Sequence, residues 1–355
     1  MGSKVNIVFV RTNATYSKIN NSAWRGILIF NTLRKMGLHN VELINSEEFS
    51  NKSREANLVC NNSNLIFIEG SPEIDLLNTV NHWKSRGKKV IVDIPLLSES
   101  QSQFLYPKSE GLFSISQIYS DYHSNECKAL DQSEKFRWGL HLADCIFVSS
   151  LVQQELWAVT APVLVIPEYI DFDSLREKTR IRDNSFIVAF ASNTKEPDDF
   201  LESVIERINN KYPRTKWLNL NSSNNKLNFK NEVTESDFPS GISNLWPDFL
   251  PIVDLGLFWD TQILRGAFYR NILELMGLHI PWITNDVRGY QDLSKYGLII
   301  HNHLNWYDVL DNVVQNSVLH IAESDEGYLY SISQNNDYHI HEVLTAFSEI
   351  LKTPS

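Results

Sequence analysis

The chain has 355 residues, of which 43% are hydrophobic and 21% are charged, and its formal net charge is -11. This length suffices for two domains of ordinary size. The negative charge argues against nucleic acid as a main partner, because binding a phosphate backbone needs a basic face. No apolar run reaches the roughly 18 residues of a transmembrane helix. The start MGSKVNIVFV has no secretory hydrophobic region, and three widely spaced cysteines indicate neither a disulfide framework nor a zinc site, so we expect a cytoplasmic protein.

The first half of the chain alternates apolar strands with helices. Helices of about 10 to 15 residues between strands predict right-handed βαβ units and a parallel sheet. The segment Leu96–Asp131 breaks this rhythm, and at about 35 residues it is longer than an ordinary connection, which favours a flap or an acceptor loop. Strands are expected at Val5–Val10, Val41–Ile44, 65–70, Lys89–Pro95, 145–150 and 163–167, and helices at Ser22–Met36, Asp75–Lys84, near Phe136 and at Leu151–Trp157.

A charged segment, Arg176–Asn184, is typical of an interdomain hinge, and a second alternating series follows it. Two doubly wound Rossmann-like domains in series predict a ligand in the cleft between them, beyond the carboxyl ends of the strands. The fold class is therefore α/β. Strands are expected at Ser185–Ala191, 217–220, Val253–Phe258, Pro281–Thr284 and 298–300, and helices at Asp198–Lys211, Ala267–Gly277, Trp306–Val313 and from Asp325 onward.

The stretch 253–292 carries the strongest chemical signal. Arg265 and Arg270 lie at or near the start of the helix expected at Ala267–Gly277, where free backbone N–H groups and the helix dipole both favour anions. Glu274 lies one turn further along and can hold the hydroxyls of a sugar or a ribose. This combination predicts a nucleotide-sugar site. The alternatives are that the arginines pair with a nearby carboxylate such as Asp260 and that Glu274 faces solvent.

Five segments resemble the GT-B glycosyltransferases, specifically the retaining family four. They are LADCIFVSSLVQQELW (142–157), APVLVIPEYIDFDSL (161–175), ASNTKEPDDF (191–200), YRNILELMGLHIPWITNDVRGYQDL (269–293) and GLIIHNHLNWYDVLDNVV (297–314). The chain differs from the family at Gly266. The family often has at this position the first glutamate of an E-x7-E pair, whose second glutamate would be Glu274. The sequence RTNATYSKINNSAW replaces the expected glycine-rich turn, and the catalytic histidine of the family has no clear equivalent.

The resemblance implies an acceptor-side domain at 1–175, a donor domain at 180–325, and a C-terminal helical segment, 326–355, that packs back on the first domain. It also implies cationic side chains and helix dipoles in place of a metal, and no cofactor besides the donor. The residues expected to act in catalysis are Arg265, Arg270, Lys195 and Asp93. Those expected to bind the donor are Ser192, Asn193, Thr194, Lys195, Arg265, Arg270, Asn271, Glu274 and Arg288. The cleft or acceptor residues are Arg11, Asn13, Asn21 and Arg25.

Simpler readings of several of these residues stay open. Lys195 fits a solvated lysine beside a helix start, and Asp93 fits a structural cap at a strand end. Asp171 and Asp173 form a D-x-D pattern, but a turn closing the first domain explains it better than a metal. His301 and His303 are expected to be surface or packing residues.

The sequence thus favours a glycosyltransferase that moves a sugar from a nucleotide-diphosphate donor to a glycan, lipid-linked or small-molecule acceptor, with retention of configuration. The alternative is a non-catalytic sugar-nucleotide or glycan-binding module that kept the scaffold, which Gly266 favours. An epimerase on the same architecture is a third reading, and no strong acid–base pair supports it.

Overall fold

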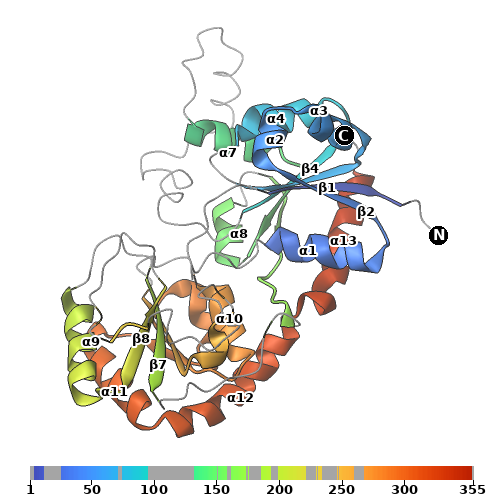
Figure 1. The fold of residues 1–355 in the computed structure, drawn as a ribbon. Coiled ribbons are helices and arrows are strands. Elements are labelled where there is room, and N and C mark those ends of the chain that lie inside the picture. Colours follow the sequence, from blue (N-terminus) through green and yellow to red (C-terminus); the bar gives the residue numbers. More distant parts are fainter. Residues whose placement is uncertain are drawn as a thin grey trace. The chain divides into compact units, whose positions relative to one another are not determined.

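The fold comes from a computed structural model and consists of two α/β units. The structure describes residues 4–11, 25–70, 74–94, 132–149, 151–157, 161–172, 175, 185–192, 199–220, 229, 231–233, 246, 248–259 and 268–353. One unit comprises Met1–Asn13, Phe30–Ile166 and Glu342–Ser355, and the other comprises Ala14–Ile29 and Pro167–His341. Figure 1 shows the two parallel sheets with the helices that cover them.

The first unit is built on a parallel sheet with the strand order β2-β1-β3-β4-β5-β6. Its inner strands are near-continuous apolar runs, as expected where both faces of a parallel sheet are covered. No residue of β2, at the edge, is fully buried. The strands are β1 (Asn6–Arg11), β2 (Asn40–Asn45), β3 (Leu65–Glu69), β4 (Lys89–Asp93), β5 (Cys145–Val148) and β6 (Val163–Val165).

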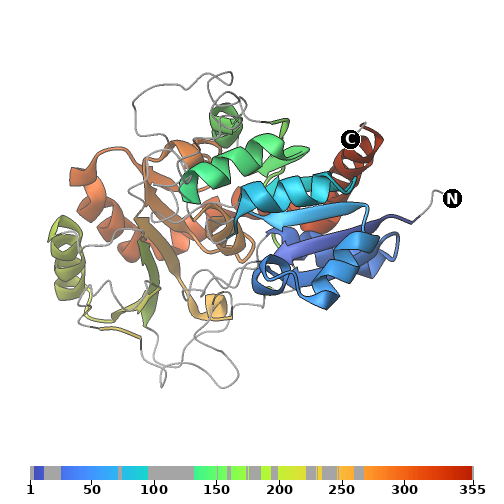
Figure 2. The ribbon, with the colours of Figure 1, turned by 90° about the horizontal axis from the view of Figure 1, so that it is seen from above.

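The helices of the first unit cover both faces of this sheet. Helices α4 and α7 lie side by side (Figure 2) so closely that a Cβ on Gly139 of α7 would come within 2.6 Å of the backbone carbonyl carbon of Leu76. On the other face, the ring of Phe347 lies 5.9 Å from that of Phe67, centroid to centroid. The helices are α1 (Arg25–Met36), α2 (Ser46–Ser50), α3 (Arg54–Asn62), α4 (Leu76–Lys84), α7 (Gln132–Leu142) and α8 (Leu151–Trp157).

The second unit holds a parallel sheet with the order β11-β10-β9-β7-β8. Apolar residues of α9 and α11 pack on one face, and those of α10 pack on the other. Gly256 of β9 admits α10 closely, because a Cβ there would come within 2.2 Å of Leu275 Cδ1. The strands are β7 (Phe186–Ser192), β8 (Thr215–Asn219), β9 (Leu255–Trp259), β10 (Trp282–Asn285) and β11 (Leu298–Ile300). The helices are α9 (Asp199–Lys211), η3 (Leu250–Ile252), α10 (Tyr269–Met276), η4 (Arg288–Leu293), η5 (His303–Asn305), α11 (Trp306–Gln315) and α12 (Ser317–Ser333). A last helix, α13 (Asn336–Lys352), begins in the second unit and continues into the first from Glu342.

The expected α/β fold with two Rossmann-like sheets is confirmed. The C-terminal region forms two helices, α12 and α13, where one was expected from Asp325 onward, and residues 342–355 of the chain's end belong to the first unit. The expected flap Leu96–Asp131 and the expected hinge Arg176–Asn184 lie outside the described residues. Within the described residues, no helix combines the length and the apolar character needed to cross a membrane.

Candidate functional site

Several polar groups lie at the carboxyl edge of the second sheet, where the carboxyl ends of its parallel strands meet. Strands β7, β9 and β10 are neighbours and run parallel, and Ser192 pairs in register with Trp259 while Phe258 pairs with Thr284. The three strands therefore end at one edge. In open α/β sheets, ligands bind beyond this edge.

Helix α10 begins at the same edge, and among the described residues its N-cap residue gives no side-chain cap. Phe268 precedes the helix, and its ring stacks on Phe258 near the end of β9 at a centroid distance of 5.2 Å. Within the described part of the chain, Phe268 provides no side-chain cap, and its own N–H donates to the hydroxyl of Tyr290 at 2.9 Å. The backbone N–H groups of a first turn without a side-chain cap, together with the helix dipole, form a ready anion site.

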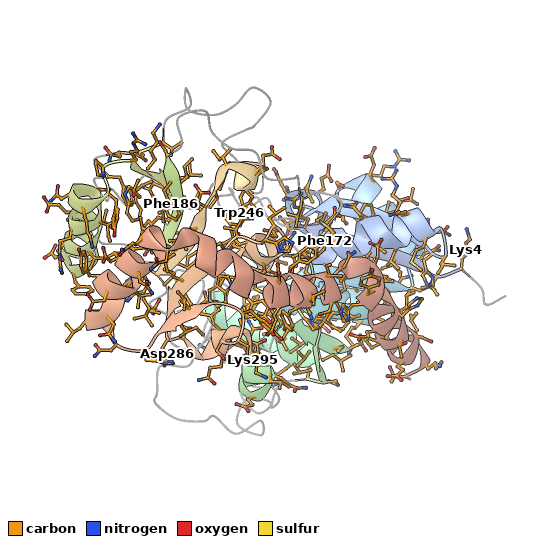
Figure 3. All side chains as sticks on the ribbon, turned by 90° about the horizontal axis from the view of Figure 1, so that it is seen from below. Lys4, Phe172, Phe186, Trp246, Asp286 and Lys295 are labelled. Atoms are coloured by element: carbon orange, nitrogen blue, oxygen red, sulfur yellow. The ribbon has the colours of Figure 1, made fainter. Side chains whose placement is uncertain are left out.

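Arg270 and Glu274 form a buried ion pair on α10. Arg270 Nε donates to Glu274 Oε1 at 3.1 Å, and the indole N–H of Trp246 donates to Glu274 Oε2. Glu274 is only 2% exposed, so the alternative that it faces solvent is wrong. Figure 3 labels Trp246 among the side chains of the second unit, where its ring also packs edge-on against Phe249. Glu274 is thus held from two sides, by a cation and by a neutral donor.

Two further polar groups at this edge are buried. Asn271, in the first turn of α10, is 4% exposed, and its Nδ2 has no hydrogen-bond partner among the described residues. Thr284, near the end of β10, is fully buried, and within the same described ranges its Oγ1 has no partner either. Buried groups of this kind cost stability when unpaired, and they are often explained by an absent ligand or water. Asn271 was expected to bind the donor, whereas Thr284 carried no signal in the sequence apart from its place at a strand end.

The first turn of α10 is anchored by a tyrosine network. The hydroxyl of Tyr269 donates to Asp292 at 2.6 Å and lies 3.1 Å from that of Tyr330 on α12. Burial first, and then the nearby carboxylate of Asp292, raise the pKa of Tyr269 above its usual range. Tyr269 therefore keeps its proton and stays a donor at neutral pH, which fixes the start of α10 against η4 and α12.

The other residues expected to bind the donor are only partly covered by the structure. Ser192 is half-buried at the end of β7, and Arg288 opens η4 just beyond β10, so both lie at the carboxyl edge. Asn193, Thr194, Lys195 and Arg265 lie outside the described residues, as do Gly266 and Asp260. The gathering of Lys195 and Arg265 with Arg270 around one anion stays a prediction.

The residues expected on the acceptor side lie in several elements. Arg11 ends β1 and is half-buried, whereas Asp93 ends β4 and is fully buried. These two positions lie at the carboxyl edge of the first sheet, separated by β3. Arg25 is the first residue of α1 and is 2% exposed. Asn13 and Asn21 lie outside the described residues, so the acceptor set stays a prediction.

Two histidines of the second unit each lie beside a carboxylate. His301 Nδ1 lies 2.8 Å from Asp286 Oδ2, and His279 Nδ1 lies 3.0 Å from Asp325 Oδ1. Among the described residues, no three His, Cys, Asp or Glu side chains gather as metal ligands would. Asp171 is half-buried, and Asp173 lies outside the described residues.

Comparison with solved structures identifies the fold. The chain is similar to a sucrose-phosphate synthase from Thermosynechococcus elongatus, with a TM-score of 0.63 and 11% identity over 97% of this chain and 98% of that one. It is also similar to HepE from Anabaena in complex with UDP and glucose, with a TM-score of 0.60 and 11% identity over 97% of this chain and 100% of that one. Neither a scan of protein-family models nor a search of curated proteins found a match. The chain has the GT-B fold of these structures, and identities this low show the fold alone.

Proposed function

We propose that this protein is a glycosyltransferase that moves a sugar from a nucleotide-diphosphate donor to an acceptor hydroxyl. One observation carries the proposal: α10 starts at the carboxyl edge of a Rossmann-like sheet without a side-chain cap from Phe268, with Arg270 and the buried amide of Asn271 in its first turn. Anions are bound in this way where helix N–H groups and a cation converge. The HepE structure, which holds UDP and glucose, supports a nucleotide-sugar ligand by analogy of fold.

The chemistry of transfer makes the leaving diphosphate the group that most needs positive charge. The bond between the anomeric carbon and the diphosphate oxygen breaks, a bond to the acceptor oxygen forms, and the departing diphosphate takes up the acceptor's proton. Negative charge grows on the diphosphate as its bond to the sugar stretches. Preorganised dipoles and cations aimed at such developing charge are the largest catalytic contribution in many enzymes. We assign this role to the α10 N-terminus and Arg270, with Lys195 and Arg265 as further cations.

The finer features are part of the same proposal. We infer that transfer retains the anomeric configuration and needs neither a metal nor another cofactor, with the second domain, 180–325, holding the donor. Ser192, Asn271, Glu274 and Arg288 complete the donor side, and the first domain, 1–175, holds the acceptor. The chain would act in the cytoplasm. The cytoplasmic setting rests on the cysteine spacing and the N-terminal sequence, and the other features rest on the resemblance of the five segments to the retaining family.

A donor panel tests the proposal. UDP-, GDP- and ADP-glucose and their N-acetylglucosamine and mannose counterparts would each be incubated with the full chain, and release of nucleoside diphosphate would be measured with and without sugar and glycolipid acceptors. We expect one nucleotide series to support slow hydrolysis and faster transfer. Tight binding without turnover would instead favour the non-catalytic module that Gly266 suggests, and no binding of any nucleotide would exclude both readings.

A further inference from the structure

The surroundings of Glu274 do not suit a ligand for sugar hydroxyls. Its carboxylate accepts from Arg270 through one oxygen and from the Trp246 indole through the other. Its side chain is only 3% exposed. A ribose or sugar hydroxyl would have to displace one of these two donors to reach it. A carboxylate that is buried and already paired acts first on its partners.

The partner that gains most from Glu274 is Arg270. Arg270 lies in the first turn of α10, where the positive end of the helix dipole opposes a cation. Its side chain is 11% exposed, so solvent screens this opposition poorly. The Glu274 carboxylate, four residues on, offsets the charge of Arg270 and accepts its Nε–H. A bond at Nε fixes the plane of the guanidinium, and so it fixes the directions of the terminal Nη groups.

A fixed guanidinium plane is what recognition of a phosphate requires. Arginine binds phosphate oxygens through parallel N–H bonds from its planar fork, and this geometry is lost when the plane is free to rotate. Trp246 is 1% exposed in the core of the second unit, and its indole in turn holds the Glu274 carboxylate in place. The core residue Trp246 therefore holds the buried carboxylate of Glu274, and Glu274 in turn holds the cation Arg270 at the start of α10.

We propose that Glu274 is a positioning residue, which orients Arg270 toward the diphosphate of the donor, and that Trp246 fixes Glu274 in turn. This inference rests on the proposed function. It differs from a direct contact of Glu274 with ribose in one measurable respect. A ribose contact depends on the sugar hydroxyls of the nucleotide, whereas positioning of Arg270 depends only on its phosphates.

Isothermal titration with UDP, GDP and ADP and with their 2′,3′-dideoxy counterparts separates the two roles. We expect Glu274→Gln to raise the Kd of the ribonucleotide and of its dideoxy counterpart by the same factor, about tenfold to a hundredfold, as for the loss of a charge-assisted hydrogen bond. If Glu274 binds ribose, the substitution will raise the Kd of the ribonucleotide alone, and the difference in Kd between the two ligands that the wild type shows will disappear. That outcome overturns the inference.

The double variant Arg270→Gln/Glu274→Gln provides a second, independent criterion. Because Glu274 acts through Arg270, the double variant should bind the diphosphate no more weakly than Arg270→Gln alone, whereas independent contacts would multiply their losses. Arg270→Lys keeps the charge without the Nε–H and should lose affinity nearly as strongly as Glu274→Gln. Losses that multiply contradict the inference.

Trp246→Phe keeps the inference testable if Glu274→Gln does not fold. This variant removes only the indole donor, and we expect a smaller loss of about two- to tenfold that is equal for both ligands of a pair. Thermal unfolding of each variant confirms that the folded protein is being titrated. If no nucleotide binds the folded wild-type chain, the proposed function itself fails. If nucleotides bind but Glu274→Gln weakens only the ribonucleotide, the proposed function stands and the positioning role of Glu274 fails.

Discussion

Helices α4 and α10 each follow a buried parallel strand of their own unit, but their first turns are completed differently. In α4, Asp75 Oδ1 accepts from the Asn78 N–H at 3.2 Å, and Asp75 Oδ2 lies 3.3 Å from Lys135 Nζ. The protein itself thus supplies the anion that a helix N-terminus favours. In α10, Phe268 gives no side-chain cap, and a cation, Arg270, occupies the first turn.

This difference separates a structural helix start from one suited to a ligand. The first turn of α4 is satisfied within the chain, so nothing further is needed there. The first turn of α10 receives no side-chain cap from Phe268 and holds a cation, Arg270, which pairs with Glu274 in the second turn. In the proposed function, a bound diphosphate would add an anion at this turn.

Arg270→Gln should have the largest effect on ligand binding. We expect the Kd of the best-binding nucleoside diphosphate to rise about tenfold to a hundredfold, because a charge-assisted contact to phosphate is lost. The salt dependence of binding should also weaken. The matched control is Asp75→Asn at the start of α4, which should leave nucleotide affinity unchanged. Equal losses of nucleotide affinity in Arg270→Gln and Asp75→Asn would show that the start of α10 is no more important for binding than the start of α4.

Glycine substitutions test how closely each helix is packed. Gly139→Ala places a Cβ within 2.6 Å of the Leu76 backbone in α4, which cannot move aside, so we expect a loss of about 1 to 3 kcal/mol from overpacking. Gly256→Ala meets side-chain atoms, the Leu275 Cδ1 of α10 at 2.2 Å and the Phe258 ring at 3.2 Å, and because side chains can shift where a backbone cannot, it should cost less. Chemical denaturation of both variants measures this order. A larger cost at Gly256 would mean that α10 is held more rigidly than α4.

Asp75→Ala should destabilise the chain by about 1 kcal/mol at neutral pH through loss of the α4 cap. Partial burial acts to raise the pKa of Asp75, but the hydrogen bonds from Asn78 and the charge of Lys135 outweigh it and hold the pKa below 3.8. A lowered folded-state pKa gives stability that is present above the unfolded value and lost as the pH falls through the folded one. The difference in free energy of unfolding between wild type and variant should therefore shrink below about pH 3.8. A constant difference would argue against a charged cap.

Tyr269→Phe should have the smallest effect. The variant loses the bonds to Asp292 and Tyr330, and because Asp292 is exposed to water, we expect only about 0.5 to 1 kcal/mol. Hydrogen exchange of the first-turn amides of α10 should rise, while that of α4 stays the same. Unchanged exchange in α10 would show that the tyrosine network does not hold its start.

The fold was largely predictable because buried parallel strands leave long apolar runs. Strands such as β4 and β9 have every residue buried, and the strands predicted at Lys89–Pro95 and Val253–Phe258 agree with them to within two residues at each end. The expected helix at Ala267–Gly277 appears as α10, which begins at Tyr269. Edges of elements follow from hydrogen bonding rather than from hydrophobicity, so small shifts of this kind are usual.

The helix that carries the candidate residues could be predicted from the sequence, but their contacts could not. Arg270 was expected near the start of a helix and Glu274 one turn further along, and both lie in α10. The bond from Trp246 to Glu274 joins residues 28 apart in sequence, and no local pattern signals such a partner.

The last residues of the chain also affect the order in which the protein can be completed. Phe347 of α13 packs on Phe67 and Phe147 of the first unit, although residues 167–341 of the second unit are made before it. Domains usually fold as they leave the ribosome, beginning at the N-terminus. The N-terminal sheet therefore obtains the packing of Phe347 only after residues 167–341 have been translated.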